Sequence, residues 1–373
     1  MSDTQQIRPR PVFSSLPEYA AGKPPAPVEG LTQYKLSSNE NPHGPVPEVA
    51  RILADFTRVH RYPDPLSTRL RERLSERLNV PAADIVTGAG SLGALEQIIK
   101  TFAGANADGS RDEVIYAWRS FEAYPILVGL AGAASVQVPN LPDGSHDLEA
   151  MLAAITERTR VILLCTPNNP TGTVLSESQV RSFMERVPKD IVVVLDEAYF
   201  EFCSVSPLEP GEQAPVNGVD LYGEYANLVL LRTFSKAQGL AGLRVGYSIS
   251  QPAITRYLRV AATPFAVTSI AEEAAVASID HEDQVMERVN HLVSERERVV
   301  AALQDAGYFF PRTFANFVWL PLGEKTPEFV QAAAAQALSV RAFGTEGVRV
   351  SIGEDEANDR MIALARDFAA HNL

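Results

Sequence analysis

The chain has 373 residues, of which 46% are apolar, and its formal net charge is -13. This length is sufficient for one large domain and a second, smaller one. The acidic balance argues against a nucleic-acid partner, because phosphate backbones attract basic surfaces. No apolar run approaches the roughly 18 residues of a membrane span, and the two cysteines are too few for a disulfide framework. We therefore expect a cytoplasmic protein that acts on small molecules.

The first 36 residues are rich in proline and poor in apolar periodicity. They predict an extended arm that packs on the small domain or on a partner subunit. Helical periodicity follows over residues 68–78. Beyond it, apolar runs of strand length alternate with segments of helix length, which is typical of a mostly parallel sheet between helices. The predicted strands cover residues 84–87, 113–117, 135–138, 160–165, 191–195, 228–231 and 245–250.

The pattern changes after residue 265. Long helices are predicted over 269–279 and 282–305, and short strands over 316–321 and 348–352. We therefore predict an α/β fold in which a large domain, 37–265, is followed by a small α+β domain, 266–373.

Polar side chains follow three consecutive predicted strands. Asn169 follows the first, Asp196 and Tyr199 follow the second, and Lys236 follows the third. Open α/β sheets bind ligands at the carboxyl ends of their strands, so we expect these four side chains to lie close together. One ligand would use all of them. Pyridoxal 5'-phosphate needs an amine for its aldehyde, a carboxylate for its ring nitrogen and hydrogen bonds for its ring oxygen.

The chain also offers groups for a phosphate. Ser235 supplies a hydroxyl next to Lys236, and Arg244 supplies a planar guanidinium. Gly90 and Ser91 belong to the sequence GAGSLG, which precedes a predicted helix over 94–102. Glycines before a helix expose backbone N–H groups to an anion, so we expect this turn to contribute to the same phosphate site.

The GAGSLG sequence also matches G-x-G-x-x-G, which leaves an NAD-dependent dehydrogenase as an alternative. That alternative needs an acid at the end of the next strand. Asp112 and Glu113 have about the right spacing, but they precede the next apolar run and would lie at its wrong end.

A hydrolase with Ser91 as its nucleophile is a more remote alternative, because the surrounding glycines resemble a relaxed nucleophile elbow. It gives no role to Lys236, Asp196 or Asn169. Its histidine would have to be one of three in helical or terminal contexts, His281, His291 and His371.

Ordered motifs extend over nearly the whole chain. They are SSNENP (37–42), RYPD (61–64), GAGS, WRSFEAYP, CTPNNPTG, DEAYFEF, TFSKAQGLAGLRVG, ANFVWLPLG and GVRVSIG (347–353). In this set the chain resembles the aspartate-aminotransferase-like enzymes of fold type I, and among them the histidinol-phosphate and aromatic amino acid aminotransferases. WRSFEAYP, FVWLPLG and RAFGTEGVRV are most similar to the actinobacterial aromatic (phenylalanine) branch. The resemblance implies a seven-stranded, mostly parallel sheet, pyridoxal 5'-phosphate as cofactor, and a homodimer with shared active sites.

The resemblance also assigns roles at the cofactor. Lys236 would bind it as an imine and later move a proton, and Asp196 would keep its ring nitrogen protonated. Phe121 would stack on its ring. The remaining predicted cofactor contacts are Asn169 and Tyr199 at the ring oxygen, Gly90, Ser91, Ser235 and Arg244 at the phosphate, and Tyr62 at the phosphate of the neighbouring subunit's cofactor.

Substrate recognition would fall to Arg349, which the resemblance places at the substrate carboxylate, and to a second arginine, Arg341. Tyr19 of the arm and Asn39 of SSNENP would contribute to the lid and the pocket. No metal is expected.

The resulting prediction is transamination of phenylalanine or tyrosine with 2-oxoglutarate. Phe265, in Thr263-Pro264-Phe265, stands where histidinol-phosphate enzymes often have a tyrosine, which favours an aromatic substrate. Transamination of histidinol phosphate remains the alternative within the family.

Overall fold

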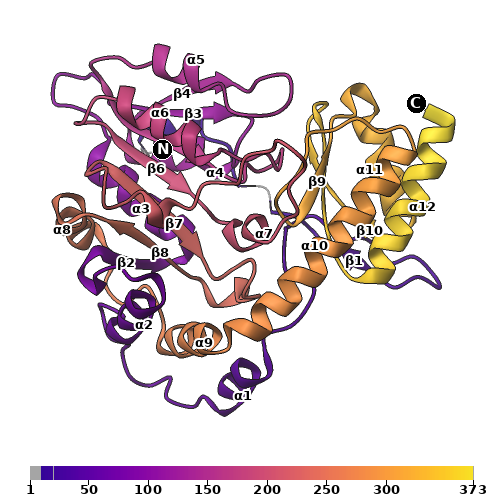
Figure 1. The fold of residues 1–373 in the computed structure, drawn as a ribbon, viewed down its shortest axis with the longest axis horizontal. Helices are drawn as coiled ribbons and strands as arrows, with labels where there is room; N and C mark the ends of the chain where they lie inside the picture. The colour runs from indigo at the N-terminus through magenta and orange to yellow at the C-terminus, as the bar shows by residue number, and fades with distance from the viewer. Residues whose placement is uncertain (1–9, 20, 373) are drawn as a thin grey trace, which may run out of the picture.

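The computed structural model describes residues 10–19 and 21–372 and has a larger and a smaller unit (Figure 1). The larger unit contains a seven-stranded sheet with the order β2-β8-β7-β6-β5-β3-β4. β8 is antiparallel to both of its neighbours, and the other neighbouring pairs are parallel. The strands are β2 (Ile85–Ala89), β3 (Glu113–Trp118), β4 (Ala134–Pro139), β5 (Thr159–Cys165), β6 (Val192–Asp196), β7 (Leu228–Thr233) and β8 (Val245–Ser250).

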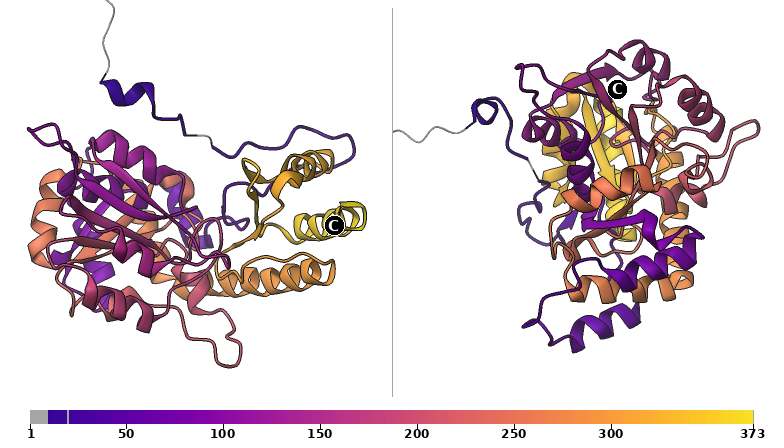
Figure 2. Two further views of the ribbon diagram at one scale, coloured as in Figure 1. Left: turned by 90° about the horizontal axis from the view of Figure 1, so that it is seen from above. Right: turned by 90° about the vertical axis from the view of Figure 1, so that its left-hand side faces the viewer.

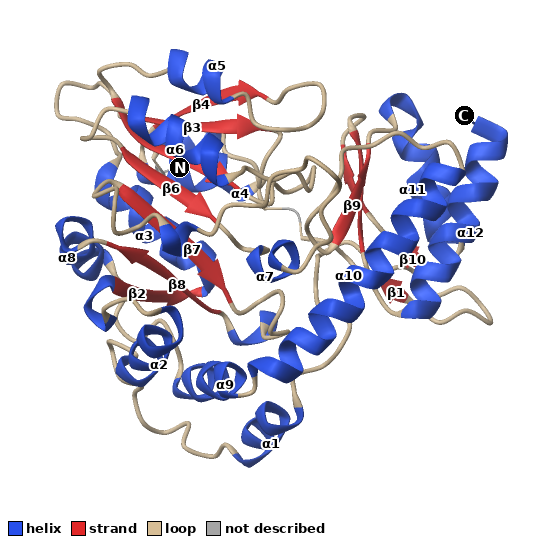
Figure 3. Cartoon of the chain, in the orientation of Figure 1, coloured by secondary structure: helices blue, strands red, loops and turns tan. Residues whose placement is uncertain are grey.

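Helices cover both faces of this sheet, and the central strands are apolar on both sides (Figure 3). In β6, Val192 and Val194 belong to one core cluster, whereas Val193 and Leu195 belong to the other. Such continuous apolar runs are expected of parallel strands buried on both faces. The larger unit's helices are α1 (Pro47–Asp55), α2 (Thr68–Leu78), α3 (Gly90–Phe102), α4 (Ala123–Ala131), α5 (Leu148–Ala153), α6 (Glu177–Arg186), α7 (Phe200–Ser204), α8 (Pro252–Ala261) and α9 (Ser269–Asp280).

The long helix α10 (Glu282–Asp305) leads from the larger unit to the smaller one (Figure 1). The smaller unit has an antiparallel sheet with the order β11-β12-β9. Near the start of the described chain, β1 (Tyr34–Lys35) pairs with β10 (Leu338–Ser339), so the end of the predicted arm lies on this unit. The other elements are β9 (Phe317–Leu320), α11 (Thr326–Ala335), β11 (Arg341–Phe343), β12 (Gly347–Ser351) and α12 (Asp355–Asn372).

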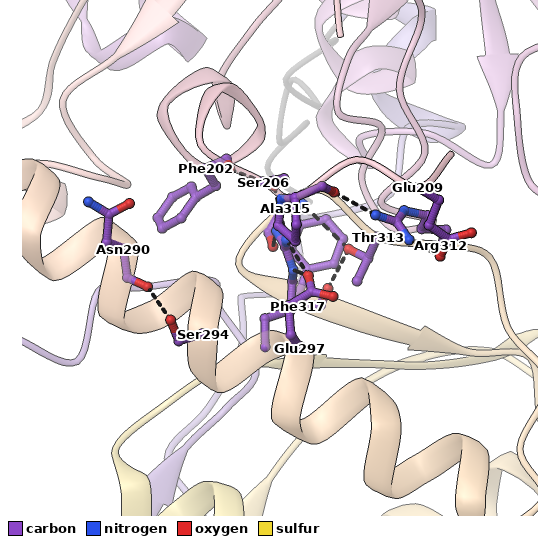
Figure 4. Close-up of polar contacts among 12 residues, drawn as sticks. Phe202, Ser206, Glu209, Asn290, Ser294, Glu297, Arg312, Thr313, Ala315 and Phe317 are labelled. Carbon is purple, nitrogen blue, oxygen red and sulfur yellow. Dashed lines mark hydrogen bonds and ion pairs between the residues drawn. The ribbon is translucent and has the colours of Figure 1, made fainter. Parts of the chain in front are cut away.

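Polar contacts join the two units where the chain enters β9 (Figure 4). The Arg312 guanidinium pairs with Glu209 and donates to the Pro207 carbonyl at 2.6 Å. The buried Arg296 of α10 donates to the Ser206 hydroxyl at 2.9 Å. These contacts fix the smaller unit against the loop that follows α7.

The described part of the N-terminal segment, from residue 10 onward, lies at the outside of the molecule (Figure 2). Arg10 donates to the Leu130 carbonyl at 3.2 Å, and the Leu16 side chain packs beside Gly129 of α4. Within the described residues, no helix combines the length and apolarity that crossing a membrane would require.

Most predicted elements are present, with strand ends that differ by one or two residues. The helix expected over 94–102 begins earlier, at Gly90, which has a φ of +74°. The dehydrogenase alternative is contradicted by the sheet order. β2 lies beside β8 and is separated from β3 by four strands, whereas a dinucleotide-binding unit places its first two strands close together and parallel.

Candidate active site

A cavity of about 300 Å³ lies at the carboxyl ends of β5, β6 and β7, between the two units. The start of α3 and strands β11 and β12 complete its wall. Twelve of the predicted site residues line it: Tyr19, Asn39, Ser91, Phe121, Asn169, Asp196, Tyr199, Ser235, Lys236, Arg244, Arg341 and Arg349. The fold as a whole therefore brings together side chains that are separated by more than 300 positions in the sequence.

Lys236 reaches the cavity three residues after β7 ends. Its Nζ donates to the Ser38 carbonyl at 3.2 Å. Burial is the main cause that lowers the pKa of this amine to about 7, and the nearby cations Arg349 and Arg244 lower it further. A large part of the amine is therefore neutral near neutral pH, which is the form that acts as a nucleophile.

Asp196 ends β6 and is 5% exposed. Its Oδ2 accepts a hydrogen bond from the Tyr124 hydroxyl at 2.7 Å, and its Oδ1 has no hydrogen-bond partner among the described residues. Burial raises the pKa of this carboxyl to about 6. A buried carboxylate oxygen that lacks a donor fits a protonated ring nitrogen, because such a group would satisfy both its charge and its hydrogen bond.

The phosphate-binding residues predicted from the sequence form a cradle at the start of α3. Arg244 Nη1 donates to the Ser235 hydroxyl at 3.3 Å, and in the described chain no carboxylate pairs with this guanidinium. A Cβ at Gly90 would collide with the Arg244 guanidinium, so only glycine permits this approach. Gly90 itself is not among the residues that line the cavity. The helix N-terminus, the hydroxyl and the free cation fit a phosphate dianion.

Aromatic and amide groups line the same cavity as the lysine and the carboxylate. The Tyr199 hydroxyl accepts a hydrogen bond from Asn39 Nδ2 at 3.0 Å, and burial raises the pKa of this phenol. The side-chain Oδ1 of Asn169 accepts a hydrogen bond from Arg349 Nη1 at 2.6 Å, and Phe121 lines the cavity. These groups fit the planar, polar-edged ring of pyridoxal 5'-phosphate.

Two arginines form the side of the cavity that belongs to the smaller unit. Arg349 is 7% exposed and donates only to neutral acceptors, the Asn169 amide and the Ser37 carbonyl. Its Nε has no acceptor among residues 10–19 and 21–372, and burial lowers its pKa. A buried guanidinium without an acidic partner fits a carboxylate ligand. Arg341 is instead paired with Glu122, and Tyr19 lies at the mouth of the cavity, 56% exposed.

Two aromatic residues from the sequence analysis lie outside this cavity. Tyr62 is 84% exposed and stacks on Phe265, with 4.9 Å between the ring centroids. Tyr62 thus does not line the cavity of its own chain. That it contacts the cofactor phosphate of a neighbouring subunit stays a prediction. The sequence analysis used Phe265 as an argument for an aromatic substrate. A single chain does not support that argument, because the Phe265 side chain does not line the cavity.

Tyr124 and Glu122 belong to the site but were missed by the sequence analysis. Cys165, at the end of β5, also lines the cavity. Tyr124 lies three residues after Phe121, near the start of α4, and this helical spacing was the available signal. The burial of Cys165 raises its thiol pKa to about 12, consistent with a packed and unreactive side chain.

The hydrolase alternative lacks its base, since none of the six histidines lines the cavity that contains Ser91. Across the described ranges, no group of three His, Cys, Asp or Glu residues could hold a metal.

The comparisons with known proteins agree with this geometry. The sequence profile of the family described as aminotransferase class I and II matches residues 32–364. The chain is 49% identical to the aromatic amino acid aminotransferase of Streptomyces avermitilis over 360 residues, which is 96% of this chain and 97% of the relative. It is 46% identical to the enzyme of the same name from Thermobifida fusca, over 100% of both chains.

A solved structure of histidinol-phosphate aminotransferase from Sinorhizobium meliloti, in complex with pyridoxal-5'-phosphate, has the same fold. It superposes with a TM-score of 0.84 at 25% identity and covers 99% of each chain.

Proposed function

Because this chain belongs to the class I and II aminotransferases, we propose that it transfers the amino group of an aromatic amino acid to 2-oxoglutarate. The observation that carries the proposal is the meeting of Lys236, Asp196 and Arg349 in one cavity. An amine, a carboxylate in need of a proton donor, and an unpaired guanidinium are the three groups that such a reaction requires.

Pyridoxal 5'-phosphate supplies an aldehyde and an electron-withdrawing ring when bound. Asp196 would hold the ring nitrogen through its free Oδ1, and Phe121 would cover one face of the ring. Asn169 and Tyr199 would contact the ring oxygen. The phosphate would be held by Ser91, Ser235, Arg244 and the N–H groups that begin at Gly90.

The Lys236 amine would act first as a nucleophile and then as the base that moves a proton from the substrate α-carbon. A pKa of about 7 suits both roles, because the amine can lose and regain a proton near neutral pH. Arg349 would hold the substrate carboxylate through its fork of donors and so orient the α-carbon toward Nζ.

Two observations support an aromatic amino donor. The relatives at 49% and 46% identity bear that name, and the cavity is lined by Phe121, Leu92 and Tyr19. Histidinol phosphate is the second candidate. It is less well supported, because the histidinol-phosphate enzyme named above is only 25% identical to this chain, whereas the two aromatic enzymes are 49% and 46% identical.

The test compares kcat/KM of the cofactor-loaded enzyme for phenylalanine and histidinol phosphate, with 2-oxoglutarate as acceptor. A large advantage for phenylalanine supports the proposal, and a large advantage for histidinol phosphate moves the enzyme to that substrate. Lys236→Ala should abolish turnover while pyridoxal phosphate still binds. Full activity in that variant would contradict the mechanism.

We also propose the finer organisation expected from the sequence: an arm over 1–36, a cofactor domain over 37–265 and a small domain over 266–373. In a homodimer, the exposed Tyr62 would reach the partner's phosphate site. Both cysteines are free and buried, which is in keeping with a reducing cytoplasm.

A further inference from the structure

Arg341 and Arg349 lie directly opposite each other on the antiparallel strands β11 and β12. Both side chains reach the same cavity. Like charges at directly opposed positions repel, so this pair needs neutralisation by nearby groups or by a ligand. The two guanidiniums have different partners.

Arg349 has only neutral acceptors, as described above, and therefore remains available for a carboxylate. Arg341 donates to Glu122 Oε2 from both Nε, at 3.1 Å, and Nη2, at 2.7 Å. Glu122 directly precedes α4, so this ion pair crosses the cavity from the smaller unit to the larger one. Apart from Arg244 at the phosphate cradle, the cavity thus contains one guanidinium without a carboxylate, Arg349, and one that is already neutralised, Arg341.

A transaminase of the proposed kind uses one cavity for two different substrates, and this inference rests on that function. The amino donor has one carboxylate and an uncharged aromatic side chain, whereas 2-oxoglutarate has a second carboxylate. Both need Arg349 for the carboxylate next to the reacting carbon. Only Arg341 remains for the second carboxylate of the acceptor.

We propose that Glu122 is a specificity-determining residue of this enzyme. It neutralises Arg341 while an uncharged aromatic side chain occupies the cavity, and it yields Arg341 to the second carboxylate when the dicarboxylic acceptor binds. The exchange leaves the number of charge pairs unchanged. The released Glu122 side chain is 29% exposed and can turn to water, whereas the Arg341 side chain, 15% exposed, cannot be left without a partner at low cost.

The surroundings of Arg341 favour such an exchange. The Phe343 ring lies 5.8 Å from each of the two guanidiniums, so an apolar surface separates them from water on that side. An ion pair in a site of this kind is stronger than on an open surface, and competition between two carboxylates is correspondingly selective.

The variant Glu122→Gln tests the proposal, because it keeps the shape of the side chain and removes its charge. Glu346→Gln is the matched control. Glu346 also pairs with an arginine, Arg119, from the other unit, but it does not line the cavity. For each cofactor-loaded protein, calorimetry measures the Kd of glutarate, a dicarboxylate, and of 3-phenylpropionate, a monocarboxylate. Kinetics measures kcat and KM for the acceptor 2-oxoglutarate and for the donor phenylalanine.

In Glu122→Gln we expect the Kd of glutarate and the KM for the acceptor to fall about tenfold, a change typical of a partly buried charge partner. 3-Phenylpropionate and phenylalanine should bind more weakly, because Arg341 then faces them unneutralised. Glu346→Gln should leave the Kd values of glutarate and 3-phenylpropionate, and the KM values of 2-oxoglutarate and phenylalanine, unchanged. Weaker glutarate binding in Glu122→Gln, or an equal change for both ligands, would overturn the proposal. If the wild-type enzyme fails to transaminate phenylalanine, the proposed function fails, and the glutarate measurement still decides the role of Glu122.

Discussion

At the residue scale, burial shifts the pKa values of the two groups that would act most directly on the cofactor, Asp196 and Lys236. The carboxyl of Asp196 is raised to about 6 and the amine of Lys236 is lowered to about 7, in both cases chiefly by burial. Each shift means that the charged form is disfavoured in the folded protein. Near neutral pH both groups therefore lower the free energy of unfolding, although the proposed reaction needs them.

The variant Asp196→Asn should be more stable than the wild type but inactive. The folded pKa of Asp196, about 6, lies above its ordinary value of 3.8, so the ionised form destabilises the fold at pH 7. We expect the cofactor-free variant to gain about 2 kcal/mol in the free energy of unfolding at pH 7. This gain should shrink below pH 6, where the aspartate becomes protonated. Urea unfolding at pH 7 and pH 5 checks it, and a loss of stability at pH 7 would contradict the assigned burial.

Lys236 should make stability rise with pH. Its folded pKa, about 7, lies below its ordinary value of 10.5, so the unfolded chain binds more protons between these two values. The free energy of unfolding of the cofactor-free protein should therefore increase from pH 7 to pH 9, relative to Lys236→Met, by up to about 2 kcal/mol. If the free energy of unfolding changed with pH equally in the wild type and in Lys236→Met, the amine would not be desolvated.

At the scale of elements, the ends of β6 and β7 are tied by a buried ion pair. Glu197 Oε2 accepts from Arg232 Nε at 2.9 Å, and Glu197 Oε1 accepts from the Gly218 N–H at 2.7 Å. The Arg232 guanidinium also lies 3.9 Å from the Phe200 ring centroid. Glu197 directly follows Asp196 in the chain and Arg232 belongs to β7, so this pair should fix the strand ends that form the cavity.

Arg232→Met should destabilise the protein by about 3 kcal/mol, because it leaves the Glu197 carboxylate buried without its partner. The double variant with Glu197→Gln should recover part of this loss, because it removes the buried charge. Thermal or urea unfolding of both variants measures the effect. Additive losses would show that the two side chains do not act as a pair.

The turn between β2 and α3 should control cofactor affinity through a single glycine. Gly90→Ala would push the Arg244 guanidinium out of the phosphate cradle, and we expect the Kd for pyridoxal phosphate to rise at least about tenfold. Gly109→Ala is the control, since Gly109 also has a positive φ, +86°, but has open space around its Cα. Equal Kd values in the two variants would show that the close approach of Gly90 and Arg244 does not control cofactor affinity.

At the scale of the whole molecule, the exposed Tyr62 and Phe265 form an aromatic pair on the outside of one chain. We expect sedimentation at twice the mass of the 40.5 kDa chain. If Tyr62 serves the partner's phosphate site, Tyr62→Ala should weaken cofactor binding although this residue lies outside its own cavity.

Hybrid dimers give the decisive form of this experiment. When Tyr62→Ala and Lys236→Ala chains are mixed, one of the two sites in each hybrid contains an intact lysine and an intact tyrosine. Activity should therefore rise above that of the Tyr62→Ala enzyme per intact lysine. No increase in hybrids of proven composition would place Tyr62 outside the shared site.

The sequence by itself determined the family, the fold class, the cofactor and the set of side chains that meet at the sheet edge. The family follows from the resemblance of the ordered motifs. The fold class and the gathering of the side chains follow from local signals, since apolar runs define strands and the residues after parallel strands must gather at one edge. The start of α3 at Gly90 was missed because glycines are poor helix formers in isolation, and here the strand, the helix and Arg244 together stabilise the turn.

Only the tertiary structure decided which groups are paired and which are left free. The position of β2 beside β8 excluded a dinucleotide fold, although the glycine motif matched it. The register of β11 against β12 placed Arg341 opposite Arg349, and the docking of the two units gave Arg341 to Glu122, 219 positions away. The fold of the larger unit likewise brings the Tyr124 hydroxyl to Asp196, 72 positions away. Such partners depend on burial and long-range packing, which no local spacing in the sequence encodes.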